Sequence, residues 1–99
     1  MTPNALYAVA AMDDAIRDAR LAPELVSNAT TGLHVASAGS TWLAHEVVGS
    51  LLTRGPMRTP APSVVAGMPN SLQINLASHY AIKGSSLGFS SACASSAHA

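Results

Sequence analysis

Apolar residues recur every three or four positions along residues 3–20, which is the spacing of an amphipathic helix. The positions at this spacing are Leu6, Val9, Met12 or Asp13, Ile16 and Ala19. Thr2 offers a hydroxyl to cap the first turn, and Pro3 suits the first helical position. We predict a helix that begins at Pro3 and ends near Arg20, with Pro23 reinforcing the stop.

Two later segments, residues 32–38 and 86–91, contain no formally charged side chain and have the composition of strands. We expect residues 32–38 to be buried on both faces, as in the strands of a parallel sheet. Each segment is followed by a short turn and the predicted start of a helix. This strand–turn–helix order predicts an α/β layered fold.

The helix after the first strand is predicted at residues 42–53, with Ser40 or Thr41 as its cap and Gly55-Pro56 as its end. The apolar side of this helix comprises Leu43, Val47, Leu51 and Leu52. Residues 55–63 are rich in proline and glycine, so we predict an irregular loop there.

A further helix is predicted before the second strand. Asn70 or Ser71 caps it, and its apolar residues continue to Tyr80. Lys83-Gly84 is expected to close this helix, because a cation suits its negative end and glycine readily adopts the left-handed cap conformation.

Charged residues make up 10% of the chain, against about a quarter in ordinary soluble domains. After Arg58 the only formally charged side chain is Lys83. A free-standing domain of this length exposes much of its surface and needs polar cover. We therefore expect residues from about Thr59 onward to face other protein, either the rest of a larger fold or a partner subunit.

The net charge is zero with the histidines neutral, so the sequence does not indicate a nucleic acid or an anionic membrane as partner. The single cysteine excludes an internal disulfide and fits a reducing compartment. No basic region precedes the first apolar residues, and no apolar run approaches the roughly 18 residues of a membrane span. These features predict a cytoplasmic location.

The chain's 4 histidines include no pair at a metal-ligand spacing, so we expect no bound metal. They are His34, His45, His79 and His98. The small-residue turn at residues 36–40 lacks the Gly-x-Gly-x-x-Gly and Gly-Lys-Ser/Thr patterns that hold phosphate. No cofactor is expected.

Cys93 lies among small residues, directly after the second predicted strand and at the predicted start of a helix. The first turn of a helix has unpaired N–H groups and partial positive charge. A thiol placed there loses its proton more easily, and the thiolate is the nucleophile. On local chemistry alone, a lone cysteine among alanines and serines is more often a buried, inert residue.

Residues 91–99, Ser-Ala-Cys-Ala-Ser-Ser-Ala-His-Ala, resemble the nucleophile signature of the β-ketoacyl-[acyl carrier protein] synthases, the ketosynthases of fatty acid and polyketide assembly. The likeness is closest to the synthase I/II branch and covers nearly the whole chain. Upstream segments follow in the family's order: residues 15–19, 31–33, 36–40, 68–70 and 80–84. The resemblance implies decarboxylative Claisen condensation on a thiolase-like fold, in which helices pack on a mixed sheet. Residues 1–99 would then be an incomplete part of a ketosynthase N-terminal domain.

The resemblance also implies roles for individual residues. Cys93 would be the nucleophile that takes the acyl chain, with its own backbone N–H as an oxyanion donor. Gly39 and Met68 would bind substrate, Gly39 by leaving the acyl tunnel open and Met68 by contacting the acyl chain. Turn geometry alone explains Gly39 equally well, and plain core packing explains Met68 equally well. His98 matches a structural position of the family, so we give it no catalytic role.

The partners implied by the resemblance are acyl carrier protein, with phosphopantetheine-linked acyl and malonyl groups, and a second subunit in a homodimer or ketosynthase heterodimer. The family's decarboxylation residues, two histidines with a lysine and a phenylalanine, lie downstream of the nucleophile and outside residues 1–99. We therefore expect this segment alone to be inactive. Two alternatives stay open: a non-catalytic truncated fragment that acts only in dimerisation, and a thiolase-fold enzyme with non-decarboxylating chemistry.

Overall fold

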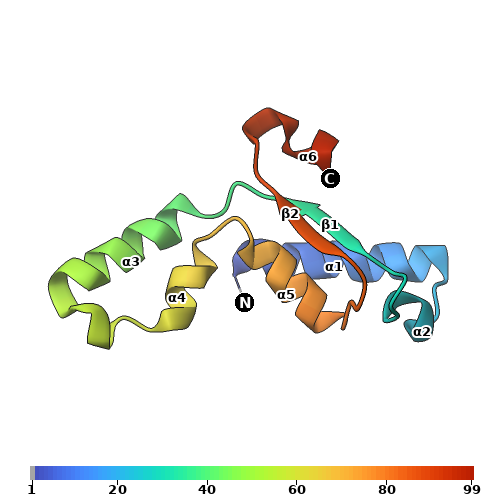
Figure 1. Ribbon diagram of the computed structural model, residues 1–99, viewed down its shortest axis with the longest axis horizontal. Coiled ribbons are helices and arrows are strands. Elements are labelled where there is room, and N and C mark those ends of the chain that lie inside the picture. The colour runs from blue at the N-terminus through green and yellow to red at the C-terminus, as the bar shows by residue number, and fades with distance from the viewer. Residues whose placement is uncertain (1) are drawn as a thin grey trace.

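The computed structural model describes residues 2–99, which form short helices around a small sheet (Figure 1). The elements in chain order are α1 (Pro3–Ala19), α2 (Pro23–Val26), β1 (Leu33–Ala36), α3 (Thr41–Arg54), the 3-10 helix η1 (Pro56–Arg58), α4 (Ala61–Ala66), α5 (Ser71–His79), β2 (Ser86–Phe89), the 3-10 helix η2 (Ala92–Ala94) and α6 (Ser95–His98). Within the described range, no helix is both long enough and apolar enough to cross a membrane.

The ends of α1 confirm the helix predicted from the sequence. The Thr2 Oγ1 accepts a hydrogen bond of 3.3 Å from the backbone N–H of Ala5, and Pro3 occupies the first turn. The helix ends at Ala19, followed by Arg20 in the left-handed conformation with φ 56°. Its start and stop are therefore set by local residues.

The sheet consists of β1 and β2, which run parallel in a register from Leu33 opposite Ser86 to Ala36 opposite Phe89. The connection between them contains α3, η1, α4 and α5. Parallel strands joined through helices confirm the predicted α/β class. They also bring the residues that follow both strands to one edge of the sheet, which we call the carboxyl edge.

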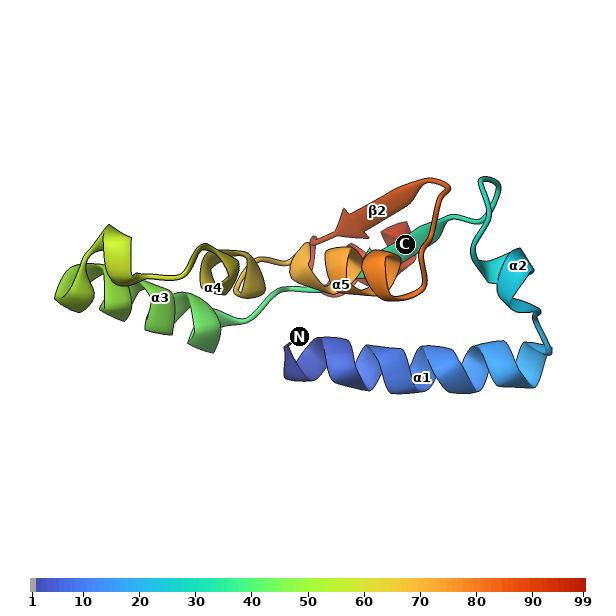
Figure 2. The ribbon, with the colours of Figure 1, turned by 90° about the horizontal axis from the view of Figure 1, so that it is seen from below.

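The two faces of the sheet have different neighbours. Gln73 on α5 donates a hydrogen bond of 2.6 Å to the Ser86 Oγ, so α5 covers the face that carries Ser86 and Gly88. Figure 2 shows α5 between this sheet and α1. On the other face, Phe89 makes an edge contact with His34 at 6.0 Å between ring centroids and stacks on His98 of α6 at 6.4 Å.

The prediction that residues 32–38 are buried on both faces is wrong for the described chain. Leu33 is buried, but His34 is exposed and the rest of β1 is half-buried. The physical reason is that α5 packs on one face of the sheet, whereas few residues of the described chain pack on the other face. A strand in a parallel sheet is buried on both faces only where helices cover both.

The helix α3 begins as predicted, because the Ser40 Oγ accepts a hydrogen bond of 3.3 Å from the Leu43 N–H. It ends at Arg54, and the next residue, Gly55, has φ 80° and caps the helix. The predicted irregular loop at residues 55–63 is wrong: η1 lies there and α4 begins at Ala61. Proline is tolerated in the first turn of a helix, so Pro56 and Pro62 do not prevent these short helices.

The predicted end of the next helix is also wrong. The helix α5 ends at His79, and Ala81 has the left-handed conformation, with φ 50°. Gly84 does not cap the helix; its N–H donates a hydrogen bond of 3.1 Å to the Thr31 carbonyl oxygen. A Cβ at Gly84 would collide with that oxygen, so glycine permits the backbone contact.

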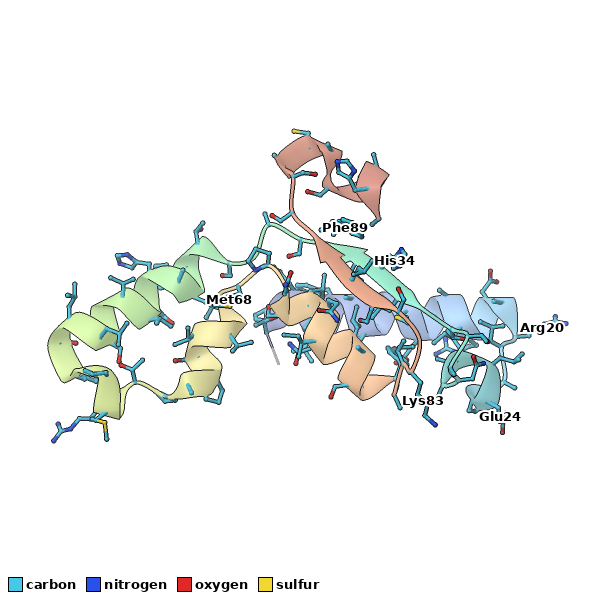
Figure 3. All side chains as sticks on the ribbon, in the orientation of Figure 1. Arg20, Glu24, His34, Met68, Lys83 and Phe89 are labelled. Carbon is cyan, nitrogen blue, oxygen red and sulfur yellow. The ribbon has the colours of Figure 1, made fainter. Side chains whose placement is uncertain are left out.

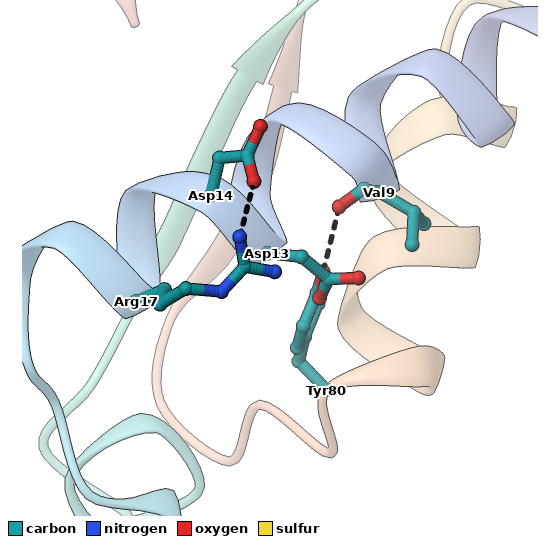
Figure 4. A network of polar contacts seen from close by, with 5 residues as sticks. All are labelled: Val9, Asp13, Asp14, Arg17 and Tyr80. Carbon is teal, nitrogen blue, oxygen red and sulfur yellow. Dashed lines mark hydrogen bonds and ion pairs between the residues drawn. The ribbon is translucent and has the colours of Figure 1, made fainter.

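One side chain from the end of α5 holds α1 in place (Figure 4). The Tyr80 Oη lies 2.5 Å from the Asp13 Oδ1 and 3.0 Å from the Val9 carbonyl oxygen. Burial, the hydrogen bond to Asp13 and the negative charge of Asp13 raise the pKa of Tyr80 to about 12. The phenol therefore stays protonated and donates to α1 at neutral pH.

The described chain is more open than a folded domain of its length. Its radius of gyration is 15.4 Å, against about 13 Å for a compact domain of this size. It exposes 6693 Å² of surface, where a folded monomer of this mass exposes about 5200 Å². The buried apolar residues are Ala5, Val26, Leu33 and Leu76. This core is small because α3 contains no buried residue.

Exposed apolar side chains occur on both sides of Thr59, so uncovered surface is not confined to the part of the chain that we expected to face other protein. Trp42 is 67% exposed, Leu52 is 82% exposed and Met57 is 97% exposed. Leu52 belongs to the predicted apolar side of α3, but no element of the described chain covers it. The sequence pattern identified the apolar side of α3, but these side chains are buried only where another element packs against them.

Candidate functional site

Three segments meet at the carboxyl edge of the sheet. The Ser37 N–H donates a hydrogen bond of 3.0 Å to the Phe89 carbonyl oxygen, which joins the ends of the two strands. A Cβ placed on Gly88 would lie 2.9 Å from the Asn70 Oδ1, so the segment before α5 lies against β2. The turn after β1 and residues 67–70 therefore lie together beside the end of β2.

Gly39 and Met68, both candidates for substrate binding, are neighbours in this region. A Cβ on Gly39 would lie 2.9 Å from the Gly67 oxygen and 3.2 Å from the Met68 carbonyl carbon. Gly39 also has φ 80°, a conformation that favours glycine. Turn geometry and close backbone approach thus account for the glycine at this position.

The Met68 side chain is 49% exposed within the described chain, so the surrounding residues leave it only partly packed (Figure 3). Its thioether is flexible and polarizable, and such a side chain adapts to apolar groups of different shape. This geometry leaves Met68 available for contact with a ligand at the carboxyl edge.

Cys93 follows β2 on a sharp turn. The strand ends at Phe89, Ala92 has φ 50°, and Cys93 lies in η2 with its thiol exposed. The sequence predicted a helix start at this position, and the structure makes its first turn a 3-10 helix, with α6 beginning at Ser95. The left-handed conformation costs an alanine about 1 kcal/mol, so other contacts must maintain the turn.

Those contacts come from Ser95, a residue that sequence reasoning missed. Ser95 is 8% exposed, and its Oγ accepts a hydrogen bond of 2.6 Å from the Ser91 N–H. The same Oγ donates a hydrogen bond of 2.8 Å to the Ala92 carbonyl oxygen. The available signal was a serine shortly after a turn, where its hydroxyl can bond to nearby backbone.

The His98 ring stacks on Phe89 with an interplanar angle of 24°. Within residues 2–99, no three histidine, cysteine, aspartate or glutamate side chains form a group able to hold a metal ion. The chemistry available at the carboxyl edge is therefore that of an exposed thiol and backbone donors.

Two hollows of the described chain lie elsewhere. One, of about 460 Å³, lies between α3 and α4 and is lined in part by Val47, Arg54 and Pro60. The other, of about 630 Å³, lies beside α4 and α5 and is lined in part by Val65 and Ile74. Neither is lined by Cys93, Gly39 or Met68.

Comparison with known proteins bears on this exposed thiol. Residues 1–99 match the family model described as "Beta-ketoacyl synthase, N-terminal domain". The chain belongs to this family. The β-ketoacyl synthase resemblance inferred from the residues around Cys93 is thereby confirmed.

Two curated relatives agree with the family match. The chain is 40% identical to 3-oxoacyl-[acyl-carrier-protein] synthase 1 of Haemophilus influenzae and 35% identical to the protein of the same name from Escherichia coli. Each alignment covers 99% of this chain and 25% of the relative. This β-ketoacyl synthase segment thus spans about a quarter of the length of these relatives.

Proposed function

We propose that this chain supplies the acyl-accepting cysteine of a condensing enzyme, which joins an acyl group on Cys93 to a malonyl unit on acyl carrier protein. The observation that carries the proposal is the exposed Cys93 on the turn after β2, in a chain of the β-ketoacyl synthase family. The names of the relatives, 3-oxoacyl-[acyl-carrier-protein] synthases, support a reaction on acyl carrier protein. We propose a thiolase-like fold for the whole enzyme.

In the first step, the Cys93 thiolate attacks the thioester carbonyl of an acyl carrier protein. The new bond joins Sγ to the acyl carbon, and the bond between that carbon and the phosphopantetheine sulfur breaks. The carrier leaves as a thiolate and takes up a proton. The backbone N–H of Cys93 donates to the oxyanion of the tetrahedral intermediate, as expected for a donor beside the attacked carbonyl.

In the second step, malonyl-carrier loses carbon dioxide and leaves an enolate. Its carbon attacks the acyl group on Cys93, which releases the Cys93 thiolate and forms a β-ketoacyl-carrier. The enolate oxygen requires hydrogen-bond donors. We assign those donors to the histidines that the family resemblance places beyond residues 1–99, so this segment alone would not catalyse condensation.

We further propose that the acyl chain runs along Gly39 and Met68. Their proximity at the carboxyl edge and the exposure of Met68 support this assignment. A side chain at position 39 would push against the backbone at residues 67–69 and narrow the path. Met68 would adjust its thioether to the alkyl chain.

The second subunit is proposed to pair along β2, as in a homodimer or ketosynthase heterodimer. Among the described residues β2 pairs only with β1, so its other edge has unpaired backbone groups. Such an edge is a template for another strand. The uncharged residues of β2 suit a buried contact.

The test uses the full-length enzyme that contains this chain, with Cys93→Ala as the variant and Ser96→Ala as the matched control in the same turn. Acyl transfer from a labelled acyl carrier protein should fall at least about a thousandfold in Cys93→Ala, because the variant lacks a nucleophile. Ser96→Ala should retain the wild-type rate, since Ser96 is exposed. Acyl transfer that survives Cys93→Ala would exclude the proposed function.

A further inference from the structure

We infer that Ser95 is a positioning residue for acylation of Cys93, acting through the backbone of the turn that carries the thiol. The inference rests on the proposed function. It concerns a side chain that does not touch the reacting atoms. The geometry that supports it is the pair of hydrogen bonds by which the Ser95 Oγ closes the turn at residues 91–95.

The two bonds hold both ends of the left-handed residue. The Oγ accepts from the Ser91 N–H at 2.6 Å, on the strand side of Ala92, and donates to the Ala92 carbonyl at 2.8 Å. The Ala92 carbonyl and the Cys93 N–H belong to the same peptide plane. Fixing that carbonyl therefore fixes the direction of the N–H proposed as the oxyanion donor.

Two backbone hydrogen bonds also span the turn, from the Ala94 N–H to the Ser91 carbonyl oxygen at 3.1 Å and from the Ser95 N–H to the Ala92 carbonyl oxygen. The Ser95 Oγ adds the side-chain contacts to these backbone bonds. No side chain caps η2. Ser95 is also buried, so water does not compete freely for its hydroxyl. Without the Oγ, we expect Ala92 to leave φ 50° for the negative φ that alanine prefers.

This role predicts a specific kinetic signature for Ser95→Ala in the full-length enzyme. The maximal rate of Cys93 acylation by an acyl carrier protein should fall about 10- to 100-fold, the loss expected when one oxyanion donor is misdirected. The KM for the carrier should stay within about threefold, because the surface that binds the carrier is unchanged. Ser95→Thr keeps the hydroxyl and should restore most of the rate, and Ser96→Ala should match the wild type.

A double variant separates backbone positioning from packing. Glycine adopts positive φ without penalty, so Ala92→Gly combined with Ser95→Ala should acylate faster than Ser95→Ala alone. The inference would be overturned if Ser95→Ala acylated Cys93 at the wild-type rate. It would also be overturned if Ser95→Thr lost as much of the acylation rate as Ser95→Ala while all variants had the same melting temperature. A double variant no faster than Ser95→Ala would overturn it too.

A crystal structure of the Ser95→Ala enzyme tests the turn without reference to acyl transfer. We expect Ala92 at negative φ in this variant, and retention of φ near 50° would overturn the inference. If wild-type enzyme takes no acyl group, the proposed function fails, and this structure still decides whether Ser95 holds the turn.

Discussion

Tyr80 is the side chain that ties α1 to the end of α5, through its Oη contacts with Asp13 and the Val9 carbonyl. We predict that Tyr80→Phe lowers the free energy of unfolding by about 1 kcal/mol at pH 7, because one hydrogen-bond donor is lost. The value is modest because Asp13 is exposed. Since the folded pKa is raised to about 12, this contribution is complete below about pH 10 and disappears as pH rises toward 12.

Urea unfolding of wild type and Tyr80→Phe at a series of pH values measures this difference in the free energy of unfolding. Tyr7→Phe on the same helix is the matched control, because Tyr7 is 76% exposed, and it should leave stability unchanged. A wild-type advantage over Tyr80→Phe that grows between pH 10 and pH 12 would contradict the sign of the raised pKa.

The residues of the site differ in how far the sequence could predict them. Cys93 was predicted as the nucleophile because its neighbours match a family motif; the structure shows it exposed on the turn after β2, and its catalytic role stays a prediction. Ser95 was missed because its importance lies in two hydrogen bonds to backbone groups. These bonds depend on the positive φ of Ala92, and no sequence pattern predicts a positive φ for an alanine.

At the scale of the elements, two glycines have opposite requirements. A Cβ on Gly84 would collide with the Thr31 carbonyl oxygen, whereas a Cβ on Gly49 in α3 would meet nothing within 4 Å. We predict that Gly84→Ala destabilises the enzyme by about 1–3 kcal/mol, because the loop before β1 must move. Gly49→Ala should stabilise it by about 0.5–1 kcal/mol, because alanine favours the helix.

Chemical denaturation of the two variants and wild type measures whether each substitution lowers or raises the free energy of unfolding. Equal stability of Gly84→Ala and wild type would show that the contact between Gly84 and Thr31 does not constrain the loop. A loss in Gly49→Ala would contradict the open surroundings of that position.

The starts of α1 and α3 were predicted best, because N-terminal caps are local. Thr2 and Ser40 cap α1 and α3 as the sequence indicated. The helix α4 was missed because proline-rich composition was interpreted as a loop, although proline fits a first turn. The burial of β1 was overestimated because it depends on what covers each face of the sheet, and within the described chain α5 covers one face.

At the scale of the whole molecule, the described chain has extents of 49 × 28 × 21 Å and a small core. Large apolar side chains are exposed along its length, including Trp42, Leu52 and Met57. We predict that residues 1–99 expressed alone associate or bind a hydrophobic dye, and unfold without a sharp transition. Sedimentation measures the association, and thermal unfolding measures the sharpness of the transition. A soluble monomer with a cooperative transition would contradict the prediction.

The central claim is that Cys93 receives the acyl group, and covalent trapping tests it most directly. The full-length enzyme would be incubated with an acyl carrier protein that bears a labelled acyl chain, then digested and sequenced by mass spectrometry. We predict an acyl thioester on the peptide that contains Cys93, and none on that peptide in Cys93→Ala. An unmodified Cys93 in enzyme that still forms β-ketoacyl product, or a label on another residue, would contradict the account.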